Sequence, residues 1–168
     1  MVDEPRAGDQ IESEIIILKA DISDAPEILA LQKISYLSEA EIYRDFTIPP
    51  LVQTLGEIEG EFTDHLFLKA VSGDRIVGSV RARENAGTCF IGRLIVSPSF
   101  RGQGIGKRLM AGIEREFSSA SRYELFTGHR SVNNLALYKR LGYLVFKIEP
   151  VSDVLTFVFL EKYARKAG

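Results

Sequence analysis

The chain has 168 residues, of which 45% are hydrophobic and 26% charged, and its formal net charge is −2. These values predict one globular domain with a buried core. They exclude a general nucleic-acid binder, whose phosphate contacts need a surplus of Lys and Arg. The sequence contains one cysteine, Cys89, and two histidines, His65 and His129. We therefore expect neither an internal disulfide nor a zinc site, and no structural metal.

The N-terminal residues contain no apolar core of a signal peptide, and the chain has no run of about 18 apolar residues. We therefore expect a cytoplasmic protein with no membrane partner and no nucleic-acid partner. Residues 1–13 are predicted to form a loose segment, and residues 14–168 a single domain. No repeat, linker or low-complexity tract divides this domain.

The first elements are predicted from local patterns. Residues 14–20 read EIIILKA, a β-branched run of strand length. Residues 24–27, Asp-Ala-Pro-Glu, supply an N-cap, an early helical proline and an Asp-x-x-Glu capping pattern, which together predict a helix over residues 25–37. Residues 36–50 are rich in aromatics and carboxylates and end in Pro-Pro, so we expect an irregular, substrate-facing connection. A short helix should follow at residues 51–58.

Three strand-like runs come next, at residues 65–71, 75–83 and 88–96, and short polar turns between them predict an antiparallel meander. From Gly104 the apolar residues recur at every fourth position, which indicates a helix with one face on a sheet. The remaining expected elements are a strand at 123–127, a helix at 133–141 and strands at 144–149 and 154–163. This order predicts an α+β fold.

The stretch RGQGIGKR, residues 101–108, places three glycines between cations just before a helix. Backbone N–H groups at such a helix start can hold an anion when no Cβ blocks the approach. The Rossmann pattern G-x-G-x-x-G fails because Lys107 and Leu109 stand where its third glycine is required. A Walker A loop also fails, since Arg101 replaces its glycine and Arg108 replaces its Ser or Thr.

What remains is Arg-x-x-Gly-x-Gly, formed by Arg101, Gly104 and Gly106. This pattern resembles the acetyl-CoA motif of the GNAT superfamily of acyl-CoA N-acyltransferases. Residues 134–143, NLALYKRLGY, resemble a late helix of the same superfamily. The resemblance covers nearly the whole chain. It implies a GNAT-like mixed, mostly antiparallel central sheet of about seven strands with helices on both faces, and acetyl-CoA as acyl donor without a metal.

Coenzyme A carries a pyrophosphate, which the N–H groups of residues 103–107 can bind if glycines keep the approach open. The resemblance also implies that Leu94, Ile95 and Val96 pair through their main chain with the pantetheine arm. Asn134 is a candidate to cap its helix or to reach the pantetheine, although the family counterpart stands nearer Ser131 or Asn133. The residues expected to bind the donor are Leu94, Ile95, Val96, Arg101, Gly102, Gln103, Gly104, Ile105, Gly106, Lys107 and Asn134.

Tyr138 is the candidate general acid, because a phenol near the sulfur can protonate the departing thiolate. The general base is left open. Some family members present a glutamate on the central strand, where this chain has Thr88 and Arg93. We favour deprotonation of the amine through water, with Glu84 or His129 as the candidate base. The lone Cys89 is interpreted as a small buried hydrophobe, which favours direct transfer over an acyl-enzyme.

The segment expected to face the acceptor alternates carboxylates with aromatics: Tyr36, Glu39, Glu41, Tyr43, Asp45 and Phe46. This pattern suits a cationic amine, but it equally suits a solvated loop with its aromatics turned inward. Glu57, Glu59 and Glu61 are interpreted as a solvated face.

The leading hypothesis is an N-acetyltransferase that moves acetyl from acetyl-CoA to a primary amine of a small molecule or peptide, by direct attack in a ternary complex. The alternative is a non-catalytic acyl-CoA-binding sensor or regulatory module, which the absence of an obvious carboxylate on the central strand favours and Tyr138 disfavours. The sequence leaves open the identity of the acceptor, the acyl-chain preference and whether the chain forms a homodimer.

Overall fold

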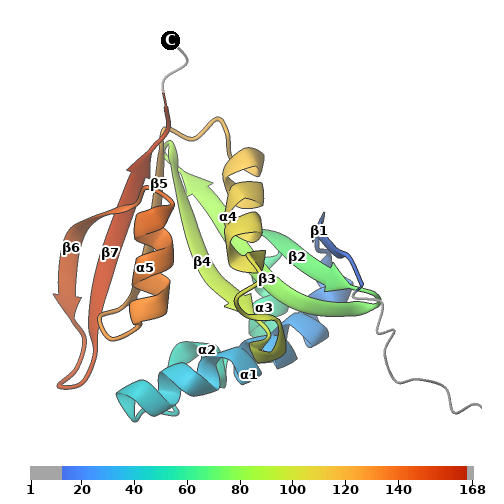
Figure 1. Ribbon diagram of the computed structural model, residues 1–168, viewed down its shortest axis with the longest axis horizontal. Helices are drawn as coiled ribbons and strands as arrows, with labels where there is room; N and C mark the ends of the chain where they lie inside the picture. Colours follow the sequence, from blue (N-terminus) through green and yellow to red (C-terminus); the bar gives the residue numbers. More distant parts are fainter. Residues whose placement is uncertain (1–12, 166–168) are drawn as a thin grey trace, which may run out of the picture.

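The computed structural model describes residues 13–165, which form a seven-stranded sheet covered by helices on both faces (Figure 1). The strands lie in the order β1-β2-β3-β4-β5-β7-β6, and every neighbouring pair is antiparallel except β4 and β5. The predicted fold class is therefore confirmed. The predicted loose segment lies, apart from residue 13, outside the described residues.

The elements, with their bounds, are β1 (Ile15–Lys19), the 3₁₀ turn η1 (Ile22–Asp24), α1 (Ala25–Tyr43), α2 (Pro49–Val52), α3 (Leu55–Glu61), β2 (Leu66–Ser72), β3 (Arg75–Asn85), β4 (Thr88–Val96), the 3₁₀ turn η2 (Pro98–Phe100), α4 (Ile105–Glu116), β5 (Arg122–Gly128), α5 (Val132–Arg140), β6 (Leu144–Pro150) and β7 (Thr156–Tyr163).

The core has two parts, one on each face of the sheet. Helices α4 and α5 pack on one face, where Leu109 and Ile113 are fully buried in a cluster with Val80. Helices α1 and α3 pack on the other face, where Ile28 and Ile58 are buried. Each such side chain contributes about 1.5–3 kcal/mol by leaving water. Strands β2, β3 and β4 contribute buried residues to both parts and therefore lie between the two layers of helices.

Helix α1 is longer than the sequence predicts, because it continues through Tyr43 instead of ending near residue 37. Ala40 and Tyr43 are buried, so packing extends the helix over a segment whose polar and aromatic composition suggests a loop. It ends at Arg44, whose φ of 52° lies in the left-handed region. The predicted short helix is two helices, α2 and α3. Thr54 and Glu57 form a capping box at the start of α3.

The capping pattern at the start of α1 differs from the expected one. The capping box joins Asp21 and Asp24 around η1, three residues earlier than predicted. The Asp24 carboxylate also pairs with the Lys69 Nζ at 2.9 Å. Glu27 does not cap the helix but accepts a hydrogen bond from the Ile76 N–H at 3.1 Å. These carboxylates therefore anchor the start of α1 to strands β2 and β3.

Strands β4 and β5 separate part of the way along the sheet. Their parallel register covers Thr88, Cys89 and Phe90 of β4 and ends there. Further along β4, Arg93 has a φ of 51°, and the register with β3 shifts at the same place. Such a bulge bends the strand. The β5 side of residues 94–96 is consequently left without a strand partner among residues 13–165.

Candidate active site

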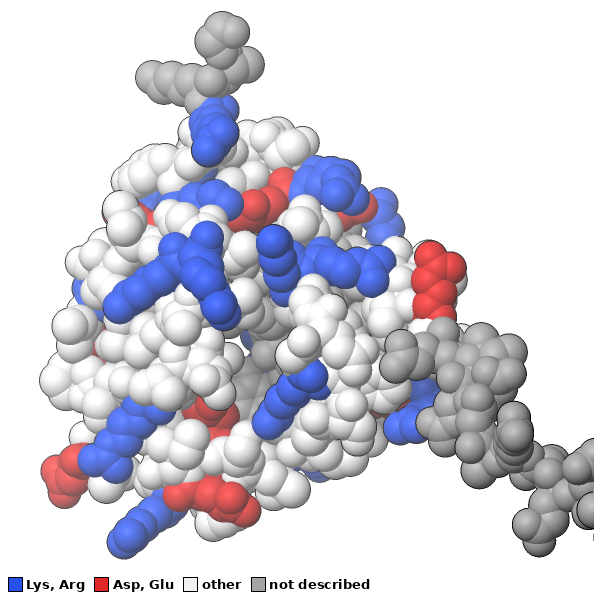
Figure 2. Space-filling model, viewed as in Figure 1, with Lys and Arg blue, Asp and Glu red and all other residues white. Residues whose placement is uncertain are grey.

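A groove with a volume of about 960 Å³ opens where the two strands separate. Its walls come from four segments: α1 between Ser35 and Ile42, the end of β4 at Leu94–Val96, the turn at residues 100–107, and residues 130–141 around α5. Figure 2 shows the molecule hollowed in this region, with Lys and Arg side chains around the opening and both acidic and basic side chains on the side of α1. The groove is the candidate active site.

The glycine turn forms one wall of the groove. Gly102 and Gly104 both have a φ of 78°, a conformation that favours glycine, and Gly104 is the residue that precedes α4. A Cβ at Gly106 would lie 3.5 Å from Leu137 and 3.8 Å from Leu94, so this glycine also lets α4 approach α5 and β4. The free N–H groups at the start of α4 therefore face an open, cation-rich space, which suits a phosphate.

The sequence-predicted donor residues nearly all lie along this groove. Leu94, Ile95 and Val96 line it, as do Arg101, Gly102, Gly104, Ile105, Gly106, Lys107 and Asn134. Gln103 is not among the lining residues, and its side chain is exposed. Arg101 donates a hydrogen bond of 3.4 Å to the Ser35 carbonyl of α1. Sequence positions 94–107 are thus brought together on one side of the groove.

Asn134 is not the helix cap. Helix α5 begins at Val132 after Ser131, and Asn134 lies inside its first turn. Its Nδ2 donates to the Thr127 Oγ1 at 3.4 Å. The alternative expectation, that Asn134 faces the donor, stays a prediction. Asn133 lines the groove as well.

Tyr138 lies on α5 with only 6% of its surface exposed. Its ring packs edge-on against that of Tyr143, with the ring centres 6.2 Å apart. Its hydroxyl has no hydrogen-bond partner among residues 13–165. Burial raises the pKa of this hydroxyl well above its ordinary value, and the charges of Tyr36 and Glu39 raise it further. Tyr138 is therefore protonated at neutral pH, as a proton donor must be.

Arg93 lies beside Tyr36 at the separation of the strands. Its guanidinium is 5.9 Å from the centre of the Tyr36 ring, a cation–π distance. Burial raises the pKa of Tyr36, and the charges of Arg93 and Arg81 oppose that rise. Where some family members present a glutamate, this chain places a cation in the left-handed conformation. Such strain in a residue other than glycine marks functional sites.

A chain of hydrogen bonds connects α1 to the loop between β5 and α5. The Ser131 hydroxyl donates to the Glu39 Oε2 at 2.5 Å, and the Tyr43 and Ser131 hydroxyls are 2.9 Å apart. The Arg130 N–H donates to the Tyr43 hydroxyl at 2.9 Å. A Cβ at Gly128 would lie 2.1 Å from that hydroxyl, so a glycine is required there.

The sequence identified the carboxylates and aromatics of this segment, but not their connection to Ser131. Glu39 and Tyr36 line the groove, whereas Glu41 and Asp45 are outside it. Tyr43 is turned inward and is 3% exposed. Only the alternation of carboxylates with aromatics hinted at the site, because Ser131 is 92 residues away in sequence.

Glu84, proposed as a base, lies away from the groove. It pairs with Cys89 in the β3–β4 hairpin, five residues before Leu94 on β4. Five strand residues span roughly 16 Å, which is beyond the reach of one side chain and one water. Glu84 is therefore not retained as a base.

His129, the other proposed base, is not among the residues that line the groove. Its Nδ1 lies 3.0 Å from the Thr156 backbone nitrogen and 3.2 Å from the Thr156 carbonyl oxygen, and the centre of its ring lies 5.9 Å from that of Tyr43. Nδ1 is thus held against the backbone of β7. The structure gives His129 a place in the β5–β7 connection rather than in the groove.

A buried polar cluster supports α1, α2 and α3 beneath the groove. Arg81 of β3 donates to the Gln32 Oε1 at 2.9 Å and to the Gln53 Oε1 at 3.2 Å. Its Nε is 3.2 Å from the Glu61 Oε2, so Glu61 is not a plain solvated residue as expected. Burial lowers the pKa of Arg81 to about 10, which leaves it charged at neutral pH. The cluster connects three helices to the central sheet.

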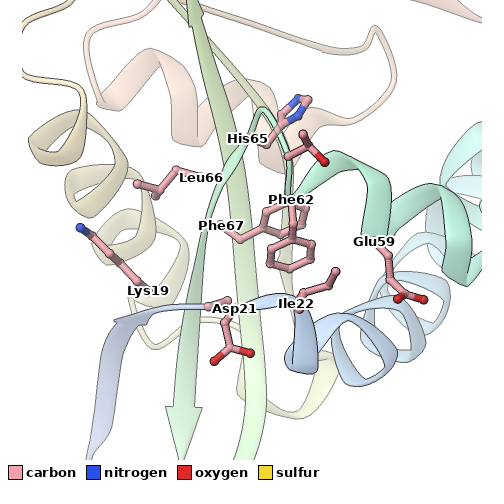
Figure 3. A pocket seen from close by; sticks show the side chains of 10 residues that line it. Lys19, Asp21, Ile22, Glu59, Phe62, His65, Leu66 and Phe67 are labelled. Atoms are coloured by element: carbon pink, nitrogen blue, oxygen red, sulfur yellow. The ribbon is translucent and has the colours of Figure 1, made fainter.

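A second hollow, of about 550 Å³, lies between η1, α3 and the start of β2 (Figure 3). The Phe62 and Phe67 rings are stacked 3.8 Å apart in its floor. Two of its polar groups already have partners, since Asp21 caps η1 and Lys19 pairs with Glu116 at 3.3 Å. It shares no lining residue with the groove, and we assign it no part in the chemistry.

Residues 13–165 contain no group of three or more His, Cys, Asp or Glu side chains that could hold a metal ion. The same residues form no helix that is long and apolar enough to cross a membrane.

The comparisons with known proteins agree with this geometry. Among solved structures, a PaiA N-acetyltransferase from Thermoplasma acidophilum in complex with coenzyme A is 20% identical and has a TM-score of 0.76, over 89% of this chain and 99% of that one. The ribosomal-protein-S18-alanine N-acetyltransferase from Escherichia coli is 15% identical and has a TM-score of 0.73, over 92% of this chain and 97% of that one. At these identities the likeness shows the fold.

The sequence is also similar to known proteins. The chain is 25% identical over 154 residues to the UPF0157 protein YqkA of Bacillus subtilis (strain 168), covering 83% of this chain and 44% of that protein. It thus spans less than half the length of this relative. Residues 29–143 match the model of the acetyltransferase (GNAT) family, a range that includes the turn, the separated strands and Tyr138. The chain belongs to the acetyltransferase (GNAT) family.

Proposed function

We propose that the chain transfers the acetyl group of acetyl-CoA to a primary amine of a small molecule or peptide, by direct attack within a ternary complex. The observation that carries this proposal is the separation of β4 from β5 directly beside the N-terminus of α4. It leaves a free strand edge beside a turn suited to phosphate, and both line one groove. Tyr138 is not itself a lining residue, but it lies on α5 next to Leu137, which lines the groove.

The donor is oriented by main-chain groups. The pyrophosphate binds the N–H groups at the start of α4, with Arg101 and Lys107 nearby. The pantetheine arm carries amide groups, which pair with the free edge of β4 at Leu94–Val96. A main-chain N–H at this edge also polarises the thioester carbonyl and stabilises the oxyanion that forms during attack.

The leaving group is assisted by Tyr138. The amine nitrogen bonds to the thioester carbon, the C–S bond breaks, and the sulfur receives a proton from the phenol. No acyl-enzyme is required, and Cys89 is fully buried at the paired end of β4.

The experiment is a thiol-release assay with acetyl-CoA and a panel of amines: spermidine, lysine, kanamycin and an alanyl peptide. Release of free coenzyme A, with an acetylated amine found by mass spectrometry, is the expected result. Binding of acetyl-CoA without turnover of any amine would instead favour the sensor.

A further inference from the structure

We infer that Glu39 binds the ammonium group of the acceptor and removes its proton, and that Ser131 and Tyr43 are positioning residues for this carboxylate. The inference rests on the proposed acetyl transfer and names the substrate class, a cationic amine, together with the missing base.

The directions of the hydrogen bonds that link Arg130, Tyr43, Ser131 and Glu39 follow from the groups involved. A carboxylate only accepts, so the Ser131 hydroxyl donates to the Glu39 Oε2. The Ser131 hydroxyl donates its only hydrogen to Glu39, so the Tyr43 hydroxyl donates to the Ser131 oxygen. The Tyr43 oxygen in turn accepts from the Arg130 N–H. Every donor points toward Glu39, so these hydrogen bonds fix the orientation of its carboxylate.

This series of hydrogen bonds holds Glu39 firmly in place. Ser131 and Tyr43 are each only 3% exposed, and Gly128 makes room for the Tyr43 hydroxyl. The Glu39 Oε1 has no hydrogen-bond partner among residues 13–165. One oxygen is therefore positioned by the protein, and the other remains for a ligand.

Among the described residues that line the groove, Glu39 is the single acidic one. Four cations also line it: Arg101, Lys107, Arg130 and Arg140. The phosphates of coenzyme A neutralise cations at the α4 end, but an ammonium group elsewhere in the groove needs a negative partner. The charge of Glu39 also contributes to the raised pKa of the Tyr138 hydroxyl, so the proposed base and acid lie in one region of the protein.

The proton balance is complete with these two residues. The ammonium loses one proton to Glu39, and the neutral nitrogen bonds to the thioester carbon. The C–S bond then breaks as Tyr138 gives its proton to the sulfur. The nitrogen's second proton returns to Tyr138 through water, and Glu39 releases its own proton to solvent. The products are an amide, the coenzyme A thiol and one proton.

The first test replaces Glu39 by Gln, which keeps the shape of the side chain and removes its charge. With the best acceptor of the amine panel, kcat/KM should fall about 100-fold while acetyl-CoA affinity stays unchanged. With hydroxylamine as acceptor, whose nitrogen is neutral at pH 7, the loss should be much smaller. Glu59→Gln, on α3 outside the groove, is the matched control and should keep parental kcat/KM.

The second test uses Ser131→Ala and Tyr43→Phe, each measured alone and combined with Glu39→Gln. Alone, each should lower kcat about tenfold because the carboxylate is less well held. In combination with Glu39→Gln, neither substitution should lower kcat further. If Ser131 and Tyr43 had a purely structural role, each substitution would lower kcat by the same factor in the parent and in Glu39→Gln. Parental kcat/KM in Glu39→Gln, or additive losses in the double variants, would overturn the inference alone. A parent that acetylates no amine of the panel would overturn the proposed function and the inference together.

Discussion

The two sides of the groove are built from different parts of the chain. The side next to α4 offers main-chain groups, namely the glycine turn and the free edge of β4. The side next to α1 offers side chains, with Glu39 held by Ser131 and with a buried cluster around Arg81 beneath the helix. A main-chain site depends on backbone conformation and tolerates most side-chain changes. A side-chain site depends on single polar atoms, which is why the two sides should respond differently to substitution.

The largest expected effect tests the main-chain side through Gly104→Val. A β-branched residue is strongly disfavoured at the φ of 78°, so the turn must change conformation and its N–H groups lose their common direction. We expect coenzyme A affinity to fall by more than about 100-fold in calorimetry. Gly60→Val, on α3 with open space around it, should bind like the parent. Micromolar binding by a folded Gly104→Val protein would place the phosphates elsewhere.

Tyr138→Phe tests the proposed general acid. Only the hydroxyl is lost, so the rate constant for chemistry should fall about 100-fold in single-turnover experiments with acetyl-CoA affinity unchanged. The midpoint of thermal unfolding should hardly move, because the hydroxyl has no partner among the described residues. Tyr143→Phe is the control: its hydroxyl bonds Glu114 at 2.9 Å, so stability should fall and chemistry should not. Unchanged chemistry in Tyr138→Phe would remove this residue from the mechanism.

Glu61→Gln tests the polar cluster under α1. Arg81 is only 3% exposed and would lose its charged partner, which destabilises the folded state. Because Glu61 itself is partly exposed, we expect a moderate loss of about 2 kcal/mol in the free energy of unfolding. Urea unfolding measures it. Glu59→Gln, in the same helix, should change stability by less than about 0.5 kcal/mol. Equal stabilities of the two variants would show that the cluster does not hold the helix.

Cys89→Ala should have the smallest effect. Burial raises the pKa of the Cys89 thiol to about 12, so the thiol stays neutral and unreactive at pH 8. The variant should keep kcat within about twofold, because direct transfer uses no cysteine. Ellman's reagent should label the parent only after unfolding. A large loss of kcat in Cys89→Ala would indicate an acyl-enzyme instead.

The elements that the sequence predicts well are those whose pattern is local. The meander of β2, β3 and β4 and the apolar stripe of α4 follow from short-range periodicity. The full length of α1 was missed, because the burial of Tyr43 depends on the loop between β5 and α5 rather than on its own neighbours in sequence. The position of Glu84 away from the groove could not be predicted for a related reason, since residue order along β3 does not show which end of the strand meets the groove.

By itself the sequence determined the turn at residues 101–108, the helix after it and their resemblance to an acetyl-CoA site, because glycine conformations and helix starts are local properties. Only the tertiary structure decided that β4 leaves β5 after Phe90, and that Glu39 meets a serine 92 residues away. A hydrogen bond forms wherever the fold brings a donor to an acceptor. Its partners leave no periodicity in the sequence, so the acceptor side became visible only when α1 was packed against the loop before α5.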